Sequence, residues 1–165
     1  MSRLRAFLAA SGATASVELA LCLPFALALI FGSFEAGNYI LTEHKVVKGV
    51  RDGARFASRL PFETFDCDTN SVLEPGLTQI ANMTRTGNPA GGPVRVAGWG
   101  DDPTDVSVSL SCDDTWNSGL YEDRGTAPRV IVSSLVPYPS ILGLLGFDTR
   151  GAVVRAQSNS AVMGR

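Results

Sequence analysis

The sequence predicts an α+β protein. A long N-terminal helix crosses a membrane, continues beyond it, and precedes a small domain with an antiparallel sheet of three to four strands. Three observations lead to this prediction. An apolar run of membrane-spanning length lies near the N-terminus, and no proline follows it until Pro61. In the C-terminal half, several segments alternate between apolar and polar residues, which is the period of a half-buried strand.

Composition narrows the functional classes. The chain has 165 residues, a net charge of −2, 18% charged residues and a mean hydropathy of +0.14. The charged fraction is lower than the roughly 25% of soluble globular proteins, which argues against an ordinary soluble protein. Intrinsic disorder is not expected either, because disordered chains combine low hydrophobicity with high net charge. One histidine and three cysteines leave little for a zinc site or a histidine-based catalytic centre. Without a basic excess, we expect no nucleic-acid partner.

The charge is divided between two unlike halves. Residues 1–59 hold seven Lys/Arg and four Asp/Glu, a net charge of +3. Residues 60–165 hold seven Arg and twelve Asp/Glu, a net charge of −5. This division predicts that the two halves work in different environments.

The first element is a transmembrane helix at residues 13–35. Between Arg5 and Glu35 the only charged residue is Glu18, and about 20 apolar residues span a bilayer core of roughly 30 Å. Pro24 lies inside the span, where membrane helices tolerate proline at the expense of a kink.

The flanking charges predict the orientation of this helix. Residues 1–12 contain Arg3 and Arg5 and no acid, which favours a cytoplasmic N-terminus. Two alternatives involve processing. A cleaved secretory signal fits badly, because large or charged residues stand where the cleavage site needs small ones. A lipoprotein would use Cys22, but Leu21 precedes it where a small residue is wanted.

Two of the three cysteines lie outside the predicted membrane helix. Cys67 and Cys112 both lie in the acidic half and can pair in an oxidising compartment. Such a disulfide would stabilise the fold by about 4 kcal/mol in the chain-entropy model. The alternative is two free thiols. Cys22 is expected to behave as a small hydrophobic residue in the helix.

Residues 36–60 are predicted to continue the helix with an amphipathic pattern. A narrow apolar stripe recurs at helical spacing, formed by Ile40, Val47, Val50, Ala54 and Ala57. Basic residues occupy other positions of this segment, and we interpret them as a solvated face rather than an anionic-lipid site. The stripe must pack against something, which predicts a folded domain over residues 61–165.

That domain is predicted to be built on a sheet. Residues 106–112 alternate strictly between apolar residues and serine, which directs Cys112 toward the core. Residues 129–136 and 152–158 read as two more strands, and residues 94–97 as a weaker fourth. A short helix is predicted at residues 78–86, closed by Gly87. The apolar segment 137–147 is interrupted by prolines and glycines; we expect core filling, with an exposed patch as the alternative.

The chain offers few candidates for chemistry. Residues 66–70 resemble the start of a calcium-binding EF-hand loop, but Ser71 and Leu77 stand where glycine and glutamate are needed. Asp101, Asp102 and Asp105 read as a polar loop rather than a weak calcium site. Hydrolase and phosphate-binding motifs are missing from the sequence. We therefore expect no enzyme activity, no cofactor and no metal.

Several motifs resemble one family. Residues 11–21, followed by Leu23-Pro24, resemble the start of TadE-like proteins: a glycine, small residues, Val-Glu, then an apolar helix with Leu-Pro. Residues 50–57 (VRDGARFA) resemble the family's continuation. The resemblance implies a type IV pilin-like fold. It also implies a minor pseudopilin of a tight-adherence (Flp) pilus system, anchored in the bacterial inner membrane with its C-terminal domain in the periplasm. The implied partners are other pilins and pseudopilins, Tad assembly proteins and a prepilin peptidase.

The same resemblance assigns roles to four residues. Gly12 would precede the peptidase cut, and Ala13 would become the new N-terminus. Glu18 would neutralise the amino terminus of a neighbouring subunit, with Pro24 in the same helix-association segment. The family places this glutamate at the fifth mature residue, whereas Glu18 is sixth when counted from Ala13; a cut after Ala13 restores the spacing. The alternatives are a Glu18 that reaches the membrane interface, and a permanently anchored protein whose sheet domain binds a partner.

Overall fold

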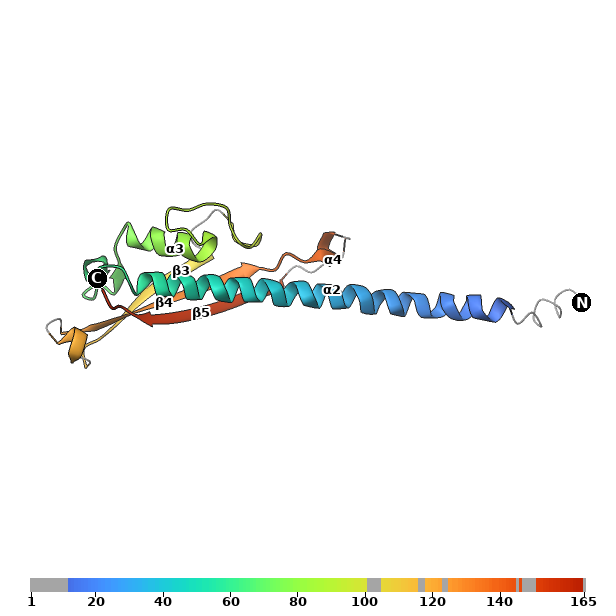
Figure 1. Cartoon of the computed structure of the whole chain (residues 1–165), viewed down its shortest axis with the longest axis horizontal. Coiled ribbons are helices and arrows are strands. Elements are labelled where there is room, and N and C mark those ends of the chain that lie inside the picture. The colour runs from blue at the N-terminus through green and yellow to red at the C-terminus, as the bar shows by residue number, and fades with distance from the viewer. Residues whose placement is uncertain are drawn as a thin grey trace, which may run out of the picture. The chain divides into compact units, whose positions relative to one another are not determined.

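The computed structural model describes residues 12–100, 105–115, 118–122, 125–144, 146 and 151–164. It divides the chain into two compact units, which we call the N-terminal unit (Met1–Asn38) and the sheet unit (Tyr39–Arg165). The elements, in chain order, are α2 (Gly12–Ala57), η1 (Phe62–Thr64), β1 (Phe65–Asp66), β2 (Ser71–Val72), α3 (Gly76–Thr86), β3 (Val106–Asp113), η3 (Gly119–Tyr121), β4 (Ala127–Pro137), α4 (Ile141–Leu144) and β5 (Val153–Ala161) (Figure 1). The predicted α+β arrangement of a long apolar helix and a small antiparallel sheet is confirmed.

α2 runs through both units as one helix with Pro24 inside it. It ends where its last turn tightens, since the N–H groups of Arg59 and Leu60 donate to the carbonyls of Phe56 and Ala57. Pro61 follows, and a proline cannot donate the hydrogen bond that would extend the helix.

The buried face of α2 in the sheet unit differs in part from the predicted stripe. Val50, Ala54 and Ala57 are buried as predicted. Val46 takes the place predicted for Val47, and Ile40 is 51% exposed. Both valines fit a helical period, and the packing of the sheet unit buries Val46.

The main sheet has the strand order β3-β4-β5, and both pairings are antiparallel. The three strong strand predictions are confirmed. Val106 and Leu110 of β3 are buried while the serines between them are exposed. The central strand β4 directs Val130, Val132 and Val136 into the core. This inner face and α2 enclose the hydrophobic core of the sheet unit.

The fourth predicted strand is wrong: residues 94–97 form bends and a turn. Here the chain is tied to helices instead of to a strand. The Arg95 N–H donates to the carbonyl of Arg85 in α3, and the Arg95 side chain bonds Asp52 in α2. Val96 and Trp99 fill the core from this segment. An unpredicted pair of two-residue strands, β1 and β2, forms a separate small sheet.

The short-helix prediction is confirmed by α3, which ends at Gly87 in the left-handed conformation, with φ at 80°. Glycine adopts this conformation at little steric cost, so it is the common residue after a helix.

The apolar segment 137–147 is divided between core and surface. Tyr138 packs edge-to-face on Tyr39 with ring centroids 5.2 Å apart and lies against the core. Ile141 is 44% exposed. Leu145 and Phe147 lie outside the described residues.

Candidate functional site

The N-terminal unit presents an apolar helix with nothing packed on it. Every side chain from residue 15 to residue 34 is exposed, including Phe25 at 74% and Leu29 at 73%. Within the described part of the chain, α2 is the one helix long and apolar enough to cross a membrane by length and composition. A contiguous apolar surface of this kind marks contact with a membrane or with other proteins.

The residues assigned to helix association lie on this surface. Glu18 and Pro24 are both exposed, and Glu18 lies about 7.5 Å along the helix axis from Ala13, at 1.5 Å per residue. The structure places the backbone of Gly12 and Ala13 at the start of α2. The basic residues Arg3 and Arg5 lie outside the described residues. The cleavage site therefore stays a prediction.

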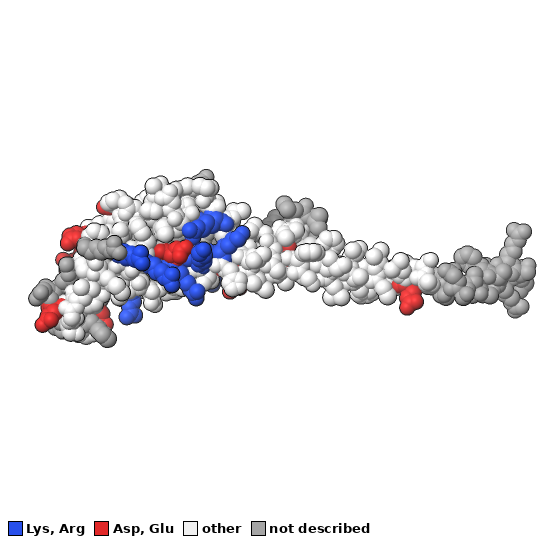
Figure 2. Space-filling model, viewed as in Figure 1, with Lys and Arg blue, Asp and Glu red and all other residues white. Residues whose placement is uncertain are grey.

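A second surface lies on α2 in the sheet unit, which we call the basic face. It consists of five exposed cations at spacings of three or four residues: Lys45, Lys48, Arg51, Arg55 and Arg59. At 100° per residue these positions fall on the side of the helix opposite Val46, Gly53 and Ala57. Figure 2 shows Lys and Arg side chains gathered on this part of the molecule.

One acid interrupts the basic face and is already engaged. The Asp52 carboxylate accepts a hydrogen bond from Arg95 at 2.9 Å, and both side chains are partly exposed. Among the described residues, this is the one ion pair with a nitrogen–oxygen distance within 4.0 Å. No described acid therefore pairs with the five cations of the basic face.

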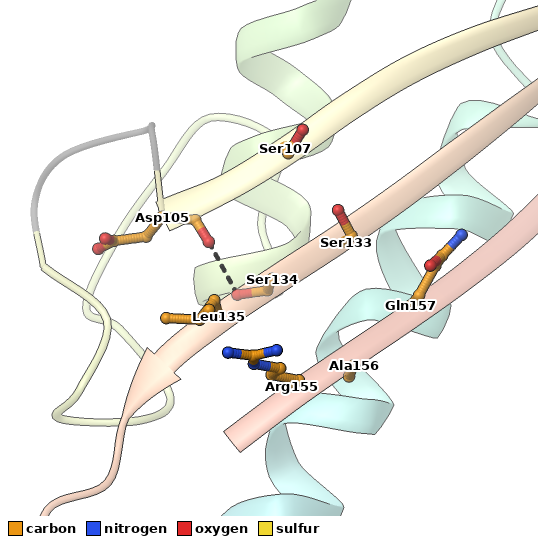
Figure 3. A pocket seen from close by; sticks show the side chains of 8 residues that line it. All are labelled: Asp105, Ser107, Ser133, Ser134, Leu135, Arg155, Ala156 and Gln157. Atoms are coloured by element: carbon orange, nitrogen blue, oxygen red, sulfur yellow. Dashed lines mark hydrogen bonds between the residues drawn. The ribbon is translucent and has the colours of Figure 1, made fainter. Parts of the chain in front are cut away.

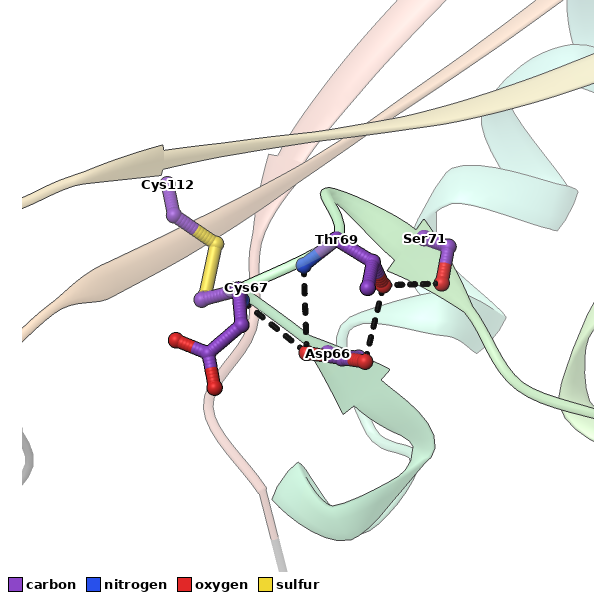
Figure 4. The surroundings of a disulfide bond; sticks show 6 residues. Asp66, Cys67, Thr69, Ser71 and Cys112 are labelled. Carbon is purple, nitrogen blue, oxygen red and sulfur yellow. Dashed lines mark hydrogen bonds between the residues drawn. A yellow bond between two sulfur atoms is a disulfide. The ribbon is translucent and has the colours of Figure 1, made fainter.

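The predicted disulfide is confirmed. Cys67 and Cys112 are bonded, with their Cα atoms 5.7 Å apart (Figure 4). The bond joins the turn after β1 to the end of β3. It also brings together two acidic pairs, because Asp66 and Asp68 flank one cysteine and Asp113 and Asp114 follow the other. We call these four residues the acidic cluster.

Two members of the acidic cluster hold local turns. Asp66 accepts the N–H of Asp68 at 2.9 Å and the Thr69 hydroxyl at 2.7 Å, as Figure 4 shows. The Thr69 hydroxyl bond is the largest cause that lowers the pKa of Asp66, and the Thr115 hydroxyl lowers the pKa of Asp113 in the same way. Both carboxylates therefore stay charged to a more acidic pH than an ordinary aspartate does.

A shallow groove lies on the sheet at the strand ends, lined mainly by small and polar side chains: Asp105, Ser107, Ser133, Ser134, Leu135, Arg155, Ala156 and Gln157 (Figure 3). Asp105 and Arg155 are its charged members. The Asp105 carboxylate accepts the Gly100 N–H at 2.7 Å, and its carbonyl accepts the Ser134 hydroxyl at 2.9 Å. The single histidine, His44, lies on α2. The groove thus supplies hydrogen-bonding groups without a nucleophile–histidine pair.

The candidate metal residues do not form a site in the described part of the chain. There, no group of three His, Cys, Asp or Glu side chains could hold a metal ion. Asp66 is used to close a turn, and Asp101 and Asp102 lie outside the described residues.

Sequence reasoning missed the residues that join the helices of the sheet unit. Gly49 and Gly53 of α2 meet Thr84 of α3, and Trp99 lies over Gly49. Trp99 is 2% exposed and donates its indole N–H to the Ser134 hydroxyl at 2.8 Å. The Gly49-x-x-x-Gly53 spacing was the available signal, since small residues four apart permit close helix packing.

The comparisons with known proteins bear on the helix. Residues 13–55 match the model of one protein family, described as TadE-like protein. No curated protein and no solved structure matches the chain.

Proposed function

We propose that this protein is a non-enzymatic minor pseudopilin of a Tad-type (Flp) pilus system, because residues 13–55 match the TadE-like family, which is associated with pilus assembly. The observation that carries the proposal is the match of the family model to the one exposed apolar helix. In this role the helix anchors the protein in the inner membrane and later packs among the helices of other subunits, while the sheet unit occupies the periplasm.

The proposed mechanism begins with processing. The basic residues of segment 1–12 hold the N-terminus in the cytoplasm. A prepilin peptidase then cuts after Gly12 or after Ala13, which removes Arg3 and Arg5 and frees an amino terminus at the start of the apolar helix. The cut follows insertion, so the positive charge that orients the chain is absent from the mature protein.

Glu18 is proposed to direct assembly. A carboxylate inside a membrane helix costs about 2.5–3.5 kcal/mol on insertion scales, so a partner charge is favoured strongly. The new amino terminus of a neighbouring subunit supplies that charge in the same layer of the membrane. Pairing the two removes both unpaired charges from the apolar environment and sets the offset between adjacent helices.

The proposal is tested in two steps. The N-terminus of the full chain is sequenced after expression with and without a prepilin peptidase, and we expect Ala13 or Thr14 first only when the peptidase is present. Piliation is then compared for Glu18→Ala and for Glu43→Ala, which removes an exposed acid from the same helix beyond the apolar run. We expect Glu18→Ala to reduce piliation at least tenfold at unchanged membrane abundance, and Glu43→Ala to have no effect.

The alternative function is a permanently anchored envelope protein whose sheet unit binds a partner. The exposed hydrogen-bonding groove of the sheet favours this second candidate. It requires an intact Met1 in both expression strains and normal piliation with Glu18→Ala, and these two results would replace the pseudopilin proposal.

A further inference from the structure

The basic face has the form of a docking surface. Its five cations cover four turns of α2, about 21 Å at 1.5 Å per residue. Among the described residues, no acid lies within 4.0 Å of any of the five. Arg95 already engages Asp52 at 2.9 Å. A row of like charges repels itself, so this face is stabilised by any anionic surface that covers it.

The same chain carries an anionic surface in the acidic cluster. The disulfide holds the four carboxylates of the acidic cluster within two residues of its two cysteines, whose Cα atoms are 5.7 Å apart. Asp68, Asp113 and Asp114 are exposed. Hydrogen bonds from Thr69 and Thr115 fix the carboxylates of Asp66 and Asp113 in place, and the positive charge of Arg129 also acts on Asp113.

The two surfaces belong to different elements of the sheet unit. The basic face lies on α2, whereas the acidic cluster lies where β1 and β3 are joined by the disulfide. Figure 2 shows the Lys and Arg side chains gathered in one group with an acidic patch among them, and other acidic side chains apart from this group. One copy can therefore use its basic face for one neighbour and its acidic cluster for another. Contacts of this heterologous kind form a ring if their rotation closes and otherwise propagate along an open assembly.

We propose that the basic face of one copy of this protein binds the acidic cluster of a second copy. Lys48, Arg51 and Arg55, at the centre of the face, contact the carboxylates next to the disulfide. The contact sets neighbouring sheet units with an offset along the helix axis. It requires two membrane-anchored copies, but it does not depend on leader cleavage or on incorporation into a pilus.

A second copy fits the basic face better than a lipid surface does. The headgroup layer on each side of a bilayer is about 5–8 Å thick, whereas the face extends about 21 Å along α2. Headgroups would therefore engage only part of the face unless the helix lay flat on the membrane. The acidic cluster, by contrast, is a protein surface of opposite charge that is present on every copy.

The test uses the full chain in phosphatidylcholine vesicles, with a mixture of ¹⁴N- and ¹⁵N-labelled protein. A zero-length carbodiimide joins lysine ammonium groups to carboxylates, and mass spectrometry identifies links between copies. We expect mixed-isotope links from Lys45 or Lys48 to the acidic cluster. Raising the salt from 50 to 500 mM is expected to reduce their yield at least threefold, since exposed charge pairs are screened.

Two charge-reversed proteins sharpen the test. One carries Lys48→Glu, Arg51→Glu and Arg55→Glu; the other carries Asp68→Lys and Asp114→Lys, which leaves the turn-forming Asp66 and Asp113 in place. Each alone is expected to lose the links between copies at least tenfold, because like charges then face each other. Mixed together, they are expected to form new links between the introduced lysines and the introduced glutamates. Glu43→Lys, which reverses an exposed acid of α2 outside both surfaces, is the matched control and should leave the yield of these links unchanged.

Three results would overturn the proposal. The first is wild-type yield of links in the variant with a reversed basic face, and the second is the absence of new links in the mixture. The third is binding of the face to lipid. In that case links between copies are absent in phosphatidylcholine vesicles, and Lys45 and Lys48 become protected from an amine-reactive reagent only in phosphatidylglycerol vesicles.

Discussion

At the scale of single residues, two glycines decide how closely α2 approaches the rest of the sheet unit. A Cβ on Gly49 would lie 2.7 Å from the Trp99 ring, and a Cβ on Gly53 would collide with the Thr84 hydroxyl. Thr84 cannot turn away freely, because its hydroxyl donates to the Ile80 carbonyl at 2.9 Å and its side chain is fully buried. Glycine at both positions therefore permits the contact between α2 and α3.

Gly53→Ala is expected to destabilise the protein. Overpacking a close contact costs about 1–3 kcal/mol, and the better helix propensity of alanine returns about 1 kcal/mol, so we expect a net loss of up to about 2 kcal/mol. The measurement is chemical unfolding of the full chain in detergent, followed by tryptophan fluorescence. Gly37→Ala is the matched control, since no atom lies within 4 Å of its Cβ; an equal loss at both positions would contradict the packing argument.

At the scale of elements, the disulfide stabilises a part of the fold that has few hydrogen bonds of its own. β1 and β2 contain two residues each, and such a short hairpin is marginal by itself in water. The bond between Cys67 and Cys112 holds this hairpin against β3, where Phe65 is buried. The cross-link thus replaces the hydrogen-bond ladder that longer strands would supply.

Removing the disulfide is expected to lower the free energy of unfolding by about 4 kcal/mol, from the chain-entropy model for a separation of 45 residues. The comparison is between the wild-type chain and the double variant Cys67→Ser, Cys112→Ser, each with and without reductant. Cys22→Ser removes the free, exposed cysteine and should behave as wild type. A wild-type protein whose stability is insensitive to reductant would refute this expectation.

At the scale of the whole molecule, one helix serves two units. The exposed apolar residues before Asn38 belong to the N-terminal unit, and the residues after Tyr39 provide one wall of the core through Val46, Val50 and Ala57. The boundary of the folded domain therefore lies inside α2 rather than at its end. A domain that began only after the end of α2 would lose the buried side chains that α2 contributes to the core.

Truncation tests this boundary. A chain that begins at Tyr39 is expected to fold and to stay in solution after membranes are sedimented, because it keeps the whole sheet unit and loses the apolar segment. A chain that begins at Ser58 is expected to be unfolded or aggregated, since the four buried apolar side chains of α2 are removed: Val46, Val50, Ala54 and Ala57. Circular dichroism melting distinguishes the two. Cooperative melting of the shorter chain would show that α2 is dispensable for the core.

The sequence by itself determined the features that follow from backbone periodicity. The strict alternation in β3, the uninterrupted length of α2 and the glycine that closes α3 are local patterns, and each was correctly predicted. The disulfide also followed, since alternation directs Cys112 toward the core and Cys67 is the other cysteine outside the apolar helix. The family motif at residues 13–55 was visible as well, whereas the cut at Gly12 or Ala13 and the role of Glu18 remain predictions.

Tertiary structure decided which distant residues meet. A helical period accepts Val46 or Val47 equally, and only the packing of the sheet against α2 selects Val46. The segment 94–97 has the composition of a strand, but Arg95 bonds Asp52 across 43 residues of sequence, so the segment is attached to a helix instead of to the sheet. The contact of Gly53 with Thr84 likewise joins residues that are far apart in the sequence. The periodicity of a sequence predicts the conformation of one segment. Contacts between segments depend on the shapes and charges of side chains that only the folded chain brings together.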